Sequence, residues 1–308
     1  MTAIVLDCDP GHDDAFAIVL AAGDPRIELL AITTVAGNQT LPKTTLNARR
    51  IATVAGIVDV PIAAGAAGPL HGELHTAPAI HGDSGLDGPR FGEPTVPLVA
   101  ADAGSLLRDT ITRAAEPVTV VAVGPLTNIA TLLLAHPGVA DRIARIVLMG
   151  GSTGRGNITP AAEFNIYVDP LAADIVFTAG IPLTMVGLNV THQALAEQRV
   201  LERIAAIGSP LSEIALGLLG FYGAAYRSVQ GFGAPPVHDP VAVAAVIAPE
   251  VLGCTPARVD IELAGEHTRG ATVVDFRSTD PNCEVATSID VERFWDLLIA
   301  AIGACSGR

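Results

Sequence analysis

The run Asp7-Cys8-Asp9-Pro10-Gly11-His12-Asp13-Asp14 constrains this chain more than any other stretch. It follows a short apolar segment, Met1 to Leu6, whose β-branched residues are typical of a buried strand. Pro10-Gly11 ends that pattern, and Ala15 to Ala22 is apolar at helical density. The carboxylates therefore lie where a strand ends and a helix begins. They repel one another unless a cation, hydrogen-bond donors or protons intervene.

We interpret this acidic run as part of a site for a divalent cation. A ligand set made only of oxygen atoms suits Ca²⁺ or Mg²⁺ better than zinc. The alternative is that Asp13 and Asp14 merely complement the positive end of a helix. That alternative accounts for one or two acids at a helix start but not for all the acids of the run.

The length and the charge of the chain bound its class. Its 308 residues, half of them hydrophobic, suit one large α/β domain over residues 1–308. The net charge of −14 argues against a nucleic-acid partner. Only 16% of the residues are charged, which is compatible with surface buried between subunits and favours a homo-oligomer.

Targeting signals are not evident. The sequence begins on a strand without a basic region or cleavage site, so we expect a cytoplasmic protein. The longest apolar stretches, such as Val241 to Ala248, are too short to span a bilayer. The four cysteines lack CxxC spacing and are interpreted as reduced thiols.

Apolar strands alternate with helical patterns throughout, which predicts an α/β fold with a mostly parallel sheet and helices on both faces. The region from Ala63 to Pro97 is rich in Gly, Pro and His, and we expect a functional loop around His81 to Leu86. Polar residues gather just past the predicted strand ends, where open α/β sheets bind their ligands. The predicted strands are Met1–Leu6, Ile27–Val35, Val118–Val123, Arg145–Met149, Pro182–Val186, Ala257–Leu263, Ala271–Phe276 and Glu284–Ile289.

Five ordered blocks resemble those of the nucleoside hydrolases, the inosine–uridine-preferring family. The first is the acidic run Asp7-x-Asp9-Pro-Gly-x-Asp13-Asp14. The others, in family order, are Val121-Ala-Val-Gly-Pro-Leu-Thr-Asn-Ile-Ala130, Ile146-Val-Leu-Met-Gly-Gly151, Glu163-Phe-Asn165 and Val237-His-Asp-Pro240. The resemblance extends from the first strand to at least Ala245 and implies a single Rossmann-like domain with a mixed sheet.

The resemblance also implies a ligand set. Asp9, Asp14 and Asp239, together with the carbonyl of Val123, would hold a Ca²⁺ ion, and the ribose 2′- and 3′-hydroxyls would complete its coordination. Asp9 and His238 would be the catalytic base and acid. The positions that match substrate contacts are Asp13, Asn38, His81, Met149, Asn157, Glu163, Asn165, Tyr226 and Asp239.

The implied reaction explains these residue types. Cleaving an N-ribosidic bond builds positive charge on the sugar, as glycoside hydrolysis does, and carboxylates and amide oxygens stabilise that charge. Calcium would orient the ribose diol and acidify a bound water, from which Asp9 would take the proton. His238 would protonate the departing base.

The substrate stays open at this point. Inosine, uridine and cytidine all fit, in a role in nucleoside salvage, and Tyr222, Tyr226 and Gln230 compete for the base contact. The family implies homotetramers or dimers. Two rival functions are a phosphatase of the haloacid dehalogenase type, with Asp7 as nucleophile, and a non-catalytic calcium-dependent nucleoside-binding protein. Gly11 stands where that phosphatase motif requires Thr or Val.

Overall fold

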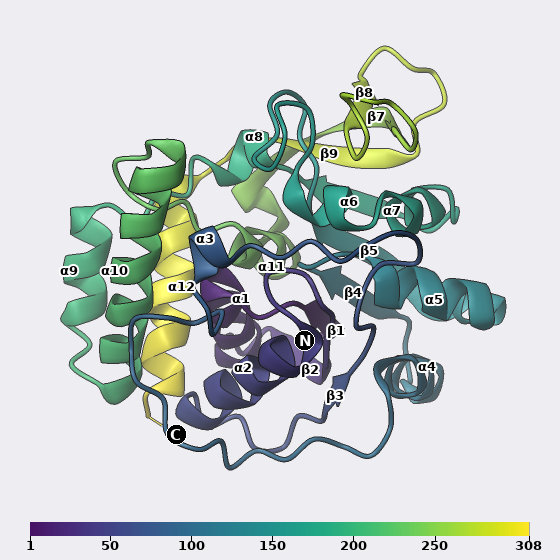
Figure 1. Ribbon diagram of the computed structural model, residues 1–308. Coiled ribbons are helices and arrows are strands. Elements are labelled where there is room, and N and C mark those ends of the chain that lie inside the picture. The colour runs from purple at the N-terminus through teal and green to yellow at the C-terminus, as the bar shows by residue number, and fades with distance from the viewer. Residues whose placement is uncertain (308) are drawn as a thin grey trace.

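A single nine-stranded sheet organises the computed structural model, which describes residues 1–307 (Figure 1). The strand order is β3-β2-β1-β4-β5-β6-β9-β7-β8, and every pairing from β3 to β9 is parallel. β7 runs antiparallel to both β9 and β8. The strands are β1 (Thr2–Cys8), β2 (Ile27–Thr34), β3 (Ile62–Ala64), β4 (Val118–Ala122), β5 (Ile143–Met149), β6 (Leu183–Val186), β7 (Leu252–Ile261), β8 (Thr272–Asp275) and β9 (Cys283–Ile289).

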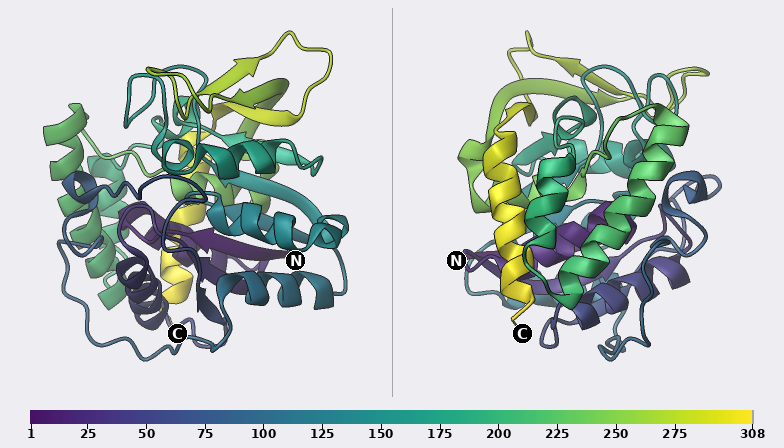
Figure 2. Two further views of the ribbon diagram at one scale, coloured as in Figure 1. Left: turned by 45° about the vertical axis from the view of Figure 1, so that its right-hand side comes forward. Right: turned by 90° about the vertical axis from the view of Figure 1, so that its left-hand side faces the viewer.

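Helices cover both faces of the sheet, as the alternating pattern predicts. On one face α1, α2, α10, α11 and α12 share a core cluster with alternate strand residues, and on the other α4, α5 and α7 share a second cluster. Figure 2 shows α9, α10 and α12 grouped together on the first face. The helices are α1 (His12–Gly23), α2 (Leu41–Val54), α3 (Pro78–His81), α4 (Ala103–Arg113), α5 (Thr127–Ala135), α6 (Phe164–Val168), α7 (Pro170–Phe177), α8 (Leu188–Thr191), α9 (Gln198–Ala205), α10 (Pro210–Gln230), α11 (Asp239–Ile247) and α12 (Val291–Cys305).

The position of β1 creates the crevice that the strand-end argument predicts. β1 pairs with β2 on one side and with β4 on the other. The chain first adds β2 and β3 on one side of β1, and then crosses over to add β4 and the later strands on the other side. Ligands bind such sheets at the carboxyl ends of strands around this switch point. Asp9 follows β1 and Val123 follows β4, so the two predicted ligands lie at the same edge.

The predicted strands and helices are present in the structure, and their ends differ from the predicted ends by a few residues. The expected loop from Ala63 to Pro97 is irregular over most of its length, but it contains the last residues of β3 and the short helix α3. The single turn of α3 ends at His81 and was not anticipated, because four residues are too few for a period to be visible. No helix within residues 1–307 has the length and apolarity needed to cross a membrane.

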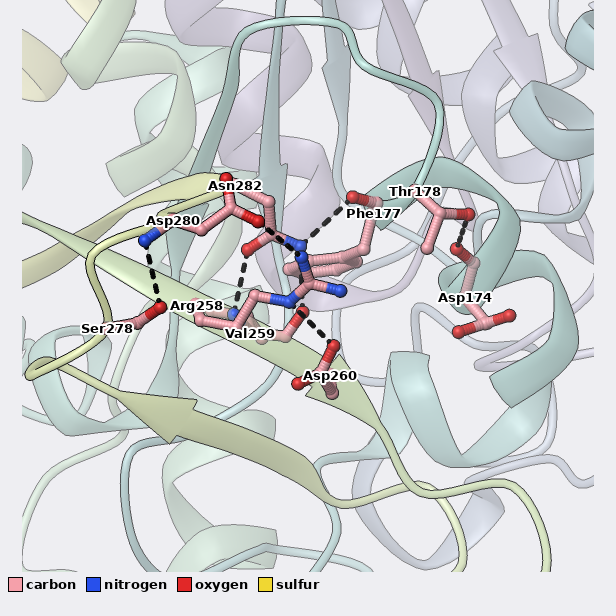
Figure 3. Close-up of polar contacts among 9 residues, drawn as sticks. All are labelled: Asp174, Phe177, Thr178, Arg258, Val259, Asp260, Ser278, Asp280 and Asn282. Atoms are coloured by element: carbon pink, nitrogen blue, oxygen red, sulfur yellow. Dashed lines mark hydrogen bonds and ion pairs between the residues drawn. The ribbon is translucent and has the colours of Figure 1, made fainter.

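A polar cluster anchors the antiparallel edge of the sheet to α7 (Figure 3). The Asn282 amide donates to the carbonyls of Phe177 and Val259 at 3.2 and 2.9 Å, and its Oδ1 accepts from the Val259 N–H at 2.8 Å. Nearby, Arg258 pairs with Asp260. These bonds satisfy one another and lie apart from the crevice, so we assign them a structural role.

Candidate active site

A pocket of about 80 Å³ opens at the switch point of the sheet. It collects nearly all of the residues that the resemblance implies, from segments spread over the whole chain. Its lining comprises Asp13, Asn38, Ala77, Ile80, His81, Val123, Met149, Asn157, Ile158, Glu163, Phe164, Asn165, Tyr222, Tyr226, Gln230, His238 and Asp239. Asp9 and Asp14 are fully buried beside this floor.

Asp14 organises the turn between β1 and α1. Its Oδ1 accepts the main-chain N–H of Asp9 at 3.0 Å, and its Oδ2 accepts that of Gly11 at 2.9 Å. The Asn38 amide also donates to Oδ2, at 3.1 Å. These donors hold the carboxylate in one orientation at the start of the helix, where negative charge is favoured.

Asp9 is held on one side only. Its Oδ2 accepts the main-chain N–H of Asn38 at 2.6 Å. Its Oδ1 is buried and has no hydrogen-bond partner among the described residues. Gly37 and Gly124 give this carboxylate its space, since a Cβ on either would lie within 2.7 Å of one of its oxygens. Burying an oxygen without a hydrogen-bond partner costs free energy unless an ion or another ligand binds that oxygen.

Asp14 also belongs to a group of three close carboxylates, of which Asp9 is not a member. Asp13, Asp14 and Asp239 each offer an oxygen, and these oxygens lie within 4.8 Å of one another. All three side chains are buried. A divalent cation fits this set, because all the donors are hard oxygens and their combined charge would otherwise be uncompensated.

The pKa values of these acids reflect their burial and their mutual repulsion. Burial, followed by repulsion from Asp14, raises the pKa of Asp9 well above its usual range and that of Asp13 to about 7. Burial also raises the pKa of Asp14, and burial with repulsion from Asp13 raises that of Asp239. Without a cation these acids resist ionising together, so metal binding and deprotonation are linked.

Asp7 stands apart from the cluster, although it belongs to the same acidic run. Its Oδ1 accepts from the hydroxyl of Thr33 at 2.5 Å and from the amide of Asn128 at 2.8 Å. These bonds tie β1 to β2 and α5 behind the crevice. Asp7 is fully buried and does not line the pocket, so it is not placed to be the nucleophile that the phosphatase alternative requires.

One side of the pocket is built from the segment around α6. Glu163 caps α6 by accepting from the N–H groups of Asn165 and Ile166, and it also accepts from Gly151. Burial raises its pKa to about 7. The amide nitrogen of Asn165 donates to the carbonyls of Val123 and Met149 at 3.0 and 3.1 Å, which fixes the Val123 carbonyl at the pocket floor.

The far end of the pocket is aromatic and rich in histidine. His81, carried by α3, receives the main-chain N–H of His12 on its Nδ1 at 3.2 Å. The ring of His12 stacks on Phe221 and Tyr222 of α10 at 5.2 Å in each case. This packing holds the start of α1 against α10, and His81 beside it lines the cavity.

His238 does not present a free ring nitrogen to the cavity. Its Nδ1 lies 2.7 Å from the hydroxyl of Thr191, and its Nε2 lies 2.7 Å from the hydroxyl of Tyr226. Burial lowers the pKa of His238 well below its usual range. The Tyr226 hydroxyl therefore stands between this histidine and the space for a ligand.

Sequence reasoning overlooked Thr191 and the ring of His12 in this arrangement. Thr191 lies on a short helix with no sequence signal beyond its neighbours, and its partner is 47 residues away. His12 was visible within the acidic run, but its stacking partners come from α10. Asp13 and Gln230 both line the pocket.

These features are those of the nucleoside hydrolases, and the chain belongs to that family. Residues 4–296 match the family described as inosine-uridine preferring nucleoside hydrolase. The protein is therefore an N-glycosyl hydrolase that acts on ribonucleosides. This membership agrees with the ordered blocks and favours the hydrolase over both rival functions.

Individual relatives cover the chain almost completely. The pyrimidine-specific ribonucleoside hydrolase RihA of Escherichia coli (strain K12) is 48% identical over 299 residues, 96% of each chain. Among solved structures, a purine-preferring ribonucleoside hydrolase from Gardnerella vaginalis superposes with a TM-score of 0.93 at 30% identity, covering 99% of each chain. A plant nucleoside hydrolase gives a TM-score of 0.90 at 32% identity over 98% of each chain.

Proposed function

We propose that this hydrolase cleaves the N-ribosidic bond of pyrimidine ribonucleosides, uridine and cytidine, and uses Ca²⁺ to do so. The observation that carries the proposal is the convergence of buried acids at the pocket floor, with Oδ1 of Asp9 left without a partner. A role in nucleoside salvage in the cytoplasm, as a homotetramer or homodimer, completes the proposal.

The residues that would hold the ion are Asp9, Asp14, Asp239 and the carbonyl of Val123. Asp13 also lies within the acidic group, and we assign it to the ribose because it lines the open pocket. When bound, Ca²⁺ would orient the ribose diol and acidify a water. Its preference for several oxygen ligands matches this donor set better than a preference for nitrogen or sulfur.

The protein residues around the sugar then favour a positively charged transition state. The carboxylates of Asp13 and Glu163 and the amide of Asn165 are held in place before the substrate arrives, so they stabilise developing charge without reorganising. Asp9 would take a proton from the attacking water as the C1′–O bond forms. The electrons of the C1′–N bond pass to the base.

The leaving base needs a hydrogen-bond donor or a proton. His238 is still assigned to this step, and the geometry assigns the direct contact to Tyr226, because its hydroxyl lies 2.7 Å from Nε2 of His238 and lines the pocket. His81 supplies a second polar contact from the long loop. Gln230 lies at the rim, where its amide is 3.5 Å from the carbonyl of Asn157.

Two observations support a pyrimidine preference. The relatives at 47–48% identity are named pyrimidine-specific, whereas the purine-preferring structure is only 30% identical. Two tyrosine rings, Tyr222 and Tyr226, also line the aromatic end of the pocket, where they meet edge to face with their centroids 4.8 Å apart. A one-ring base needs less room there than a two-ring base.

The proposal is tested by measuring base release from uridine, cytidine, inosine, adenosine and 2′-deoxyuridine. We expect uridine and cytidine to give the highest kcat/KM, and the deoxynucleoside to be cleaved poorly because it lacks one hydroxyl of the diol. Asp141 is an exposed acid far from the pocket, so the variant Asp141→Asn should show the same order of substrates as the parent and is the control. Higher kcat/KM for inosine than for uridine would overturn the pyrimidine assignment.

A further inference from the structure

The side chain of Thr191 forms a contact with His238 that family membership does not explain. Thr191 is the last residue of α8 and is fully buried. Its hydroxyl oxygen lies 2.7 Å from Nδ1 of His238, on the side of the imidazole away from Tyr226. Both nitrogens of the His238 ring therefore have a hydrogen-bond partner.

Main-chain pairing brings the two residues together. Leu195 and Pro236 form an isolated antiparallel bridge. On either side of it, the Ala196 N–H donates to the Pro235 carbonyl at 2.9 Å and the Val237 N–H donates to the Ala194 carbonyl at 3.0 Å. This short ladder fixes the segment after α8 against the segment before α11. The contact is therefore a built feature of the fold.

The direction of the hydrogen bond follows from where the hydroxyl proton can go. Thr44 and Thr178 donate their hydroxyl protons to main-chain carbonyls. Thr191 has no such carbonyl partner within residues 1–307, and Nδ1 of His238 is its acceptor. A buried hydroxyl that fails to donate loses a hydrogen bond without compensation. Thr191 therefore donates, and Nδ1 carries no proton.

The rest of the network is then determined. A neutral imidazole holds one proton, so the proton of His238 is on Nε2. Nε2–H donates to the Tyr226 oxygen at 2.7 Å, so the hydroxyl proton of Tyr226 is not given to His238 and is available to an acceptor in the cavity that Tyr226 lines. In the other tautomer, Nε2 would accept that proton and turn the tyrosine away from the ligand. The tautomer of His238 therefore decides whether Tyr226 donates its hydroxyl proton to His238 or to a ligand in the cavity.

We propose that Thr191 is a positioning residue that holds His238 in the Nε2–H tautomer, so that Tyr226 offers its hydroxyl proton to an acceptor atom of the leaving base. This inference rests on the proposed function. It involves no transfer from Thr191: the base receives a hydrogen bond from Tyr226, which His238 polarises from behind. Thr191 acts only through the imidazole.

A spectroscopic test addresses the tautomer directly. The metal-loaded protein would be labelled with ¹⁵N-histidine, and the ring nitrogens of His238 assigned by comparison with His238→Gln. We expect Nε2 to be protonated and Nδ1 to be bare in the parent and in Thr191→Ser. In Thr191→Val, which has nearly the same volume but no hydroxyl, we expect a mixture of tautomers. A parent protein with its proton on Nδ1 overturns the inference, whether or not any variant folds.

A kinetic test separates this inference from the proposed function. We expect Thr191→Val to lower kcat for uridine about tenfold, equivalent to one hydrogen bond, with KM little changed, and Thr191→Ser to restore it. Hydrolysis of p-nitrophenyl riboside, whose leaving group departs as an anion, should be unchanged. Unchanged uridine turnover in Thr191→Val overturns the inference alone, whereas a parent enzyme inactive on both substrates overturns the proposed function.

Discussion

The hydroxyl of Tyr226 lies 2.7 Å from Nε2 of His238, and both side chains are buried against the floor of the pocket. This contact changes how the histidine acts. A free imidazole would reach the substrate itself, whereas this one reaches it through a phenol. The proximity of Tyr222 to Tyr226 extends the chain of polar groups toward Asp13.

Tyr226→Phe should lower kcat/KM for uridine by roughly 10²-fold, the usual effect of removing one proton-transfer or donor group. Activity on p-nitrophenyl riboside should persist, because its leaving group needs no donor. Steady-state kinetics on both substrates check this, and Tyr167→Phe, outside the pocket lining, is the matched control. Equal losses on both substrates would show that the tyrosine acts on the sugar or the fold instead.

Asp14→Asn should abolish metal binding and reduce turnover by at least about 10²-fold. The amide keeps the size of the side chain but removes the charge, and its NH₂ group faces the N–H donors of Asp9 and Gly11 or the amide of Asn38. Metal content by elemental mass spectrometry and uridine hydrolysis provide the two readouts. Full metal content in this variant would contradict the assigned ligand set.

Gly11→Ala should displace the loop histidine and also press on the amide of Asn38, which donates to Asp14. An added Cβ would lie 2.4 Å from Nδ1 of His81, so this ring must move. Displacing a substrate-contacting group by about 1 Å costs roughly 10²-fold in kcat/KM. Gly138→Ala, where a Cβ meets nothing within 4 Å, is the control. Metal content reports whether the Asn38 amide, which binds Asp14, has moved as well. Parent kinetics would show that His81 does not contact the substrate.

The stability of the metal-free protein should depend on pH through Glu163. Burial raises its pKa from 4.5 to about 7, so the folded state binds its proton more tightly than the unfolded state does. Its contribution is fully present below pH 4.5 and is lost as the pH rises to about 7. The loss amounts to about 3 kcal/mol over that window.

Glu163→Gln should remove this part of the pH dependence, because glutamine does not titrate. Urea unfolding of both proteins in chelator, from pH 4.5 to 8, measures the difference in slope. The acid cluster is common to both proteins and cancels in the comparison. Parallel curves would mean that Glu163 is ionised in the folded state throughout.

The fold class and the family could be predicted by reading along the amino-acid sequence. Periodic apolar segments defined the parallel strands, because burial on both faces requires continuous hydrophobic runs. Residues such as Asp9, Asn38 and Val123 follow those strands, and parallel strands bring their ends to one edge. The ordered family blocks then pointed to the correct family.

The partner that each polar atom meets became known only from the folded structure. The bond between Thr191 and His238, the diversion of Asp7 to Thr33 and Asn128, and the stacking of His12 on α10 join segments far apart in the chain. Local propensity carries no information about such pairs, since their energies depend on distances that exist only after the helices pack. The acidic residues could be found by reading along the chain, but their division of roles required the folded geometry.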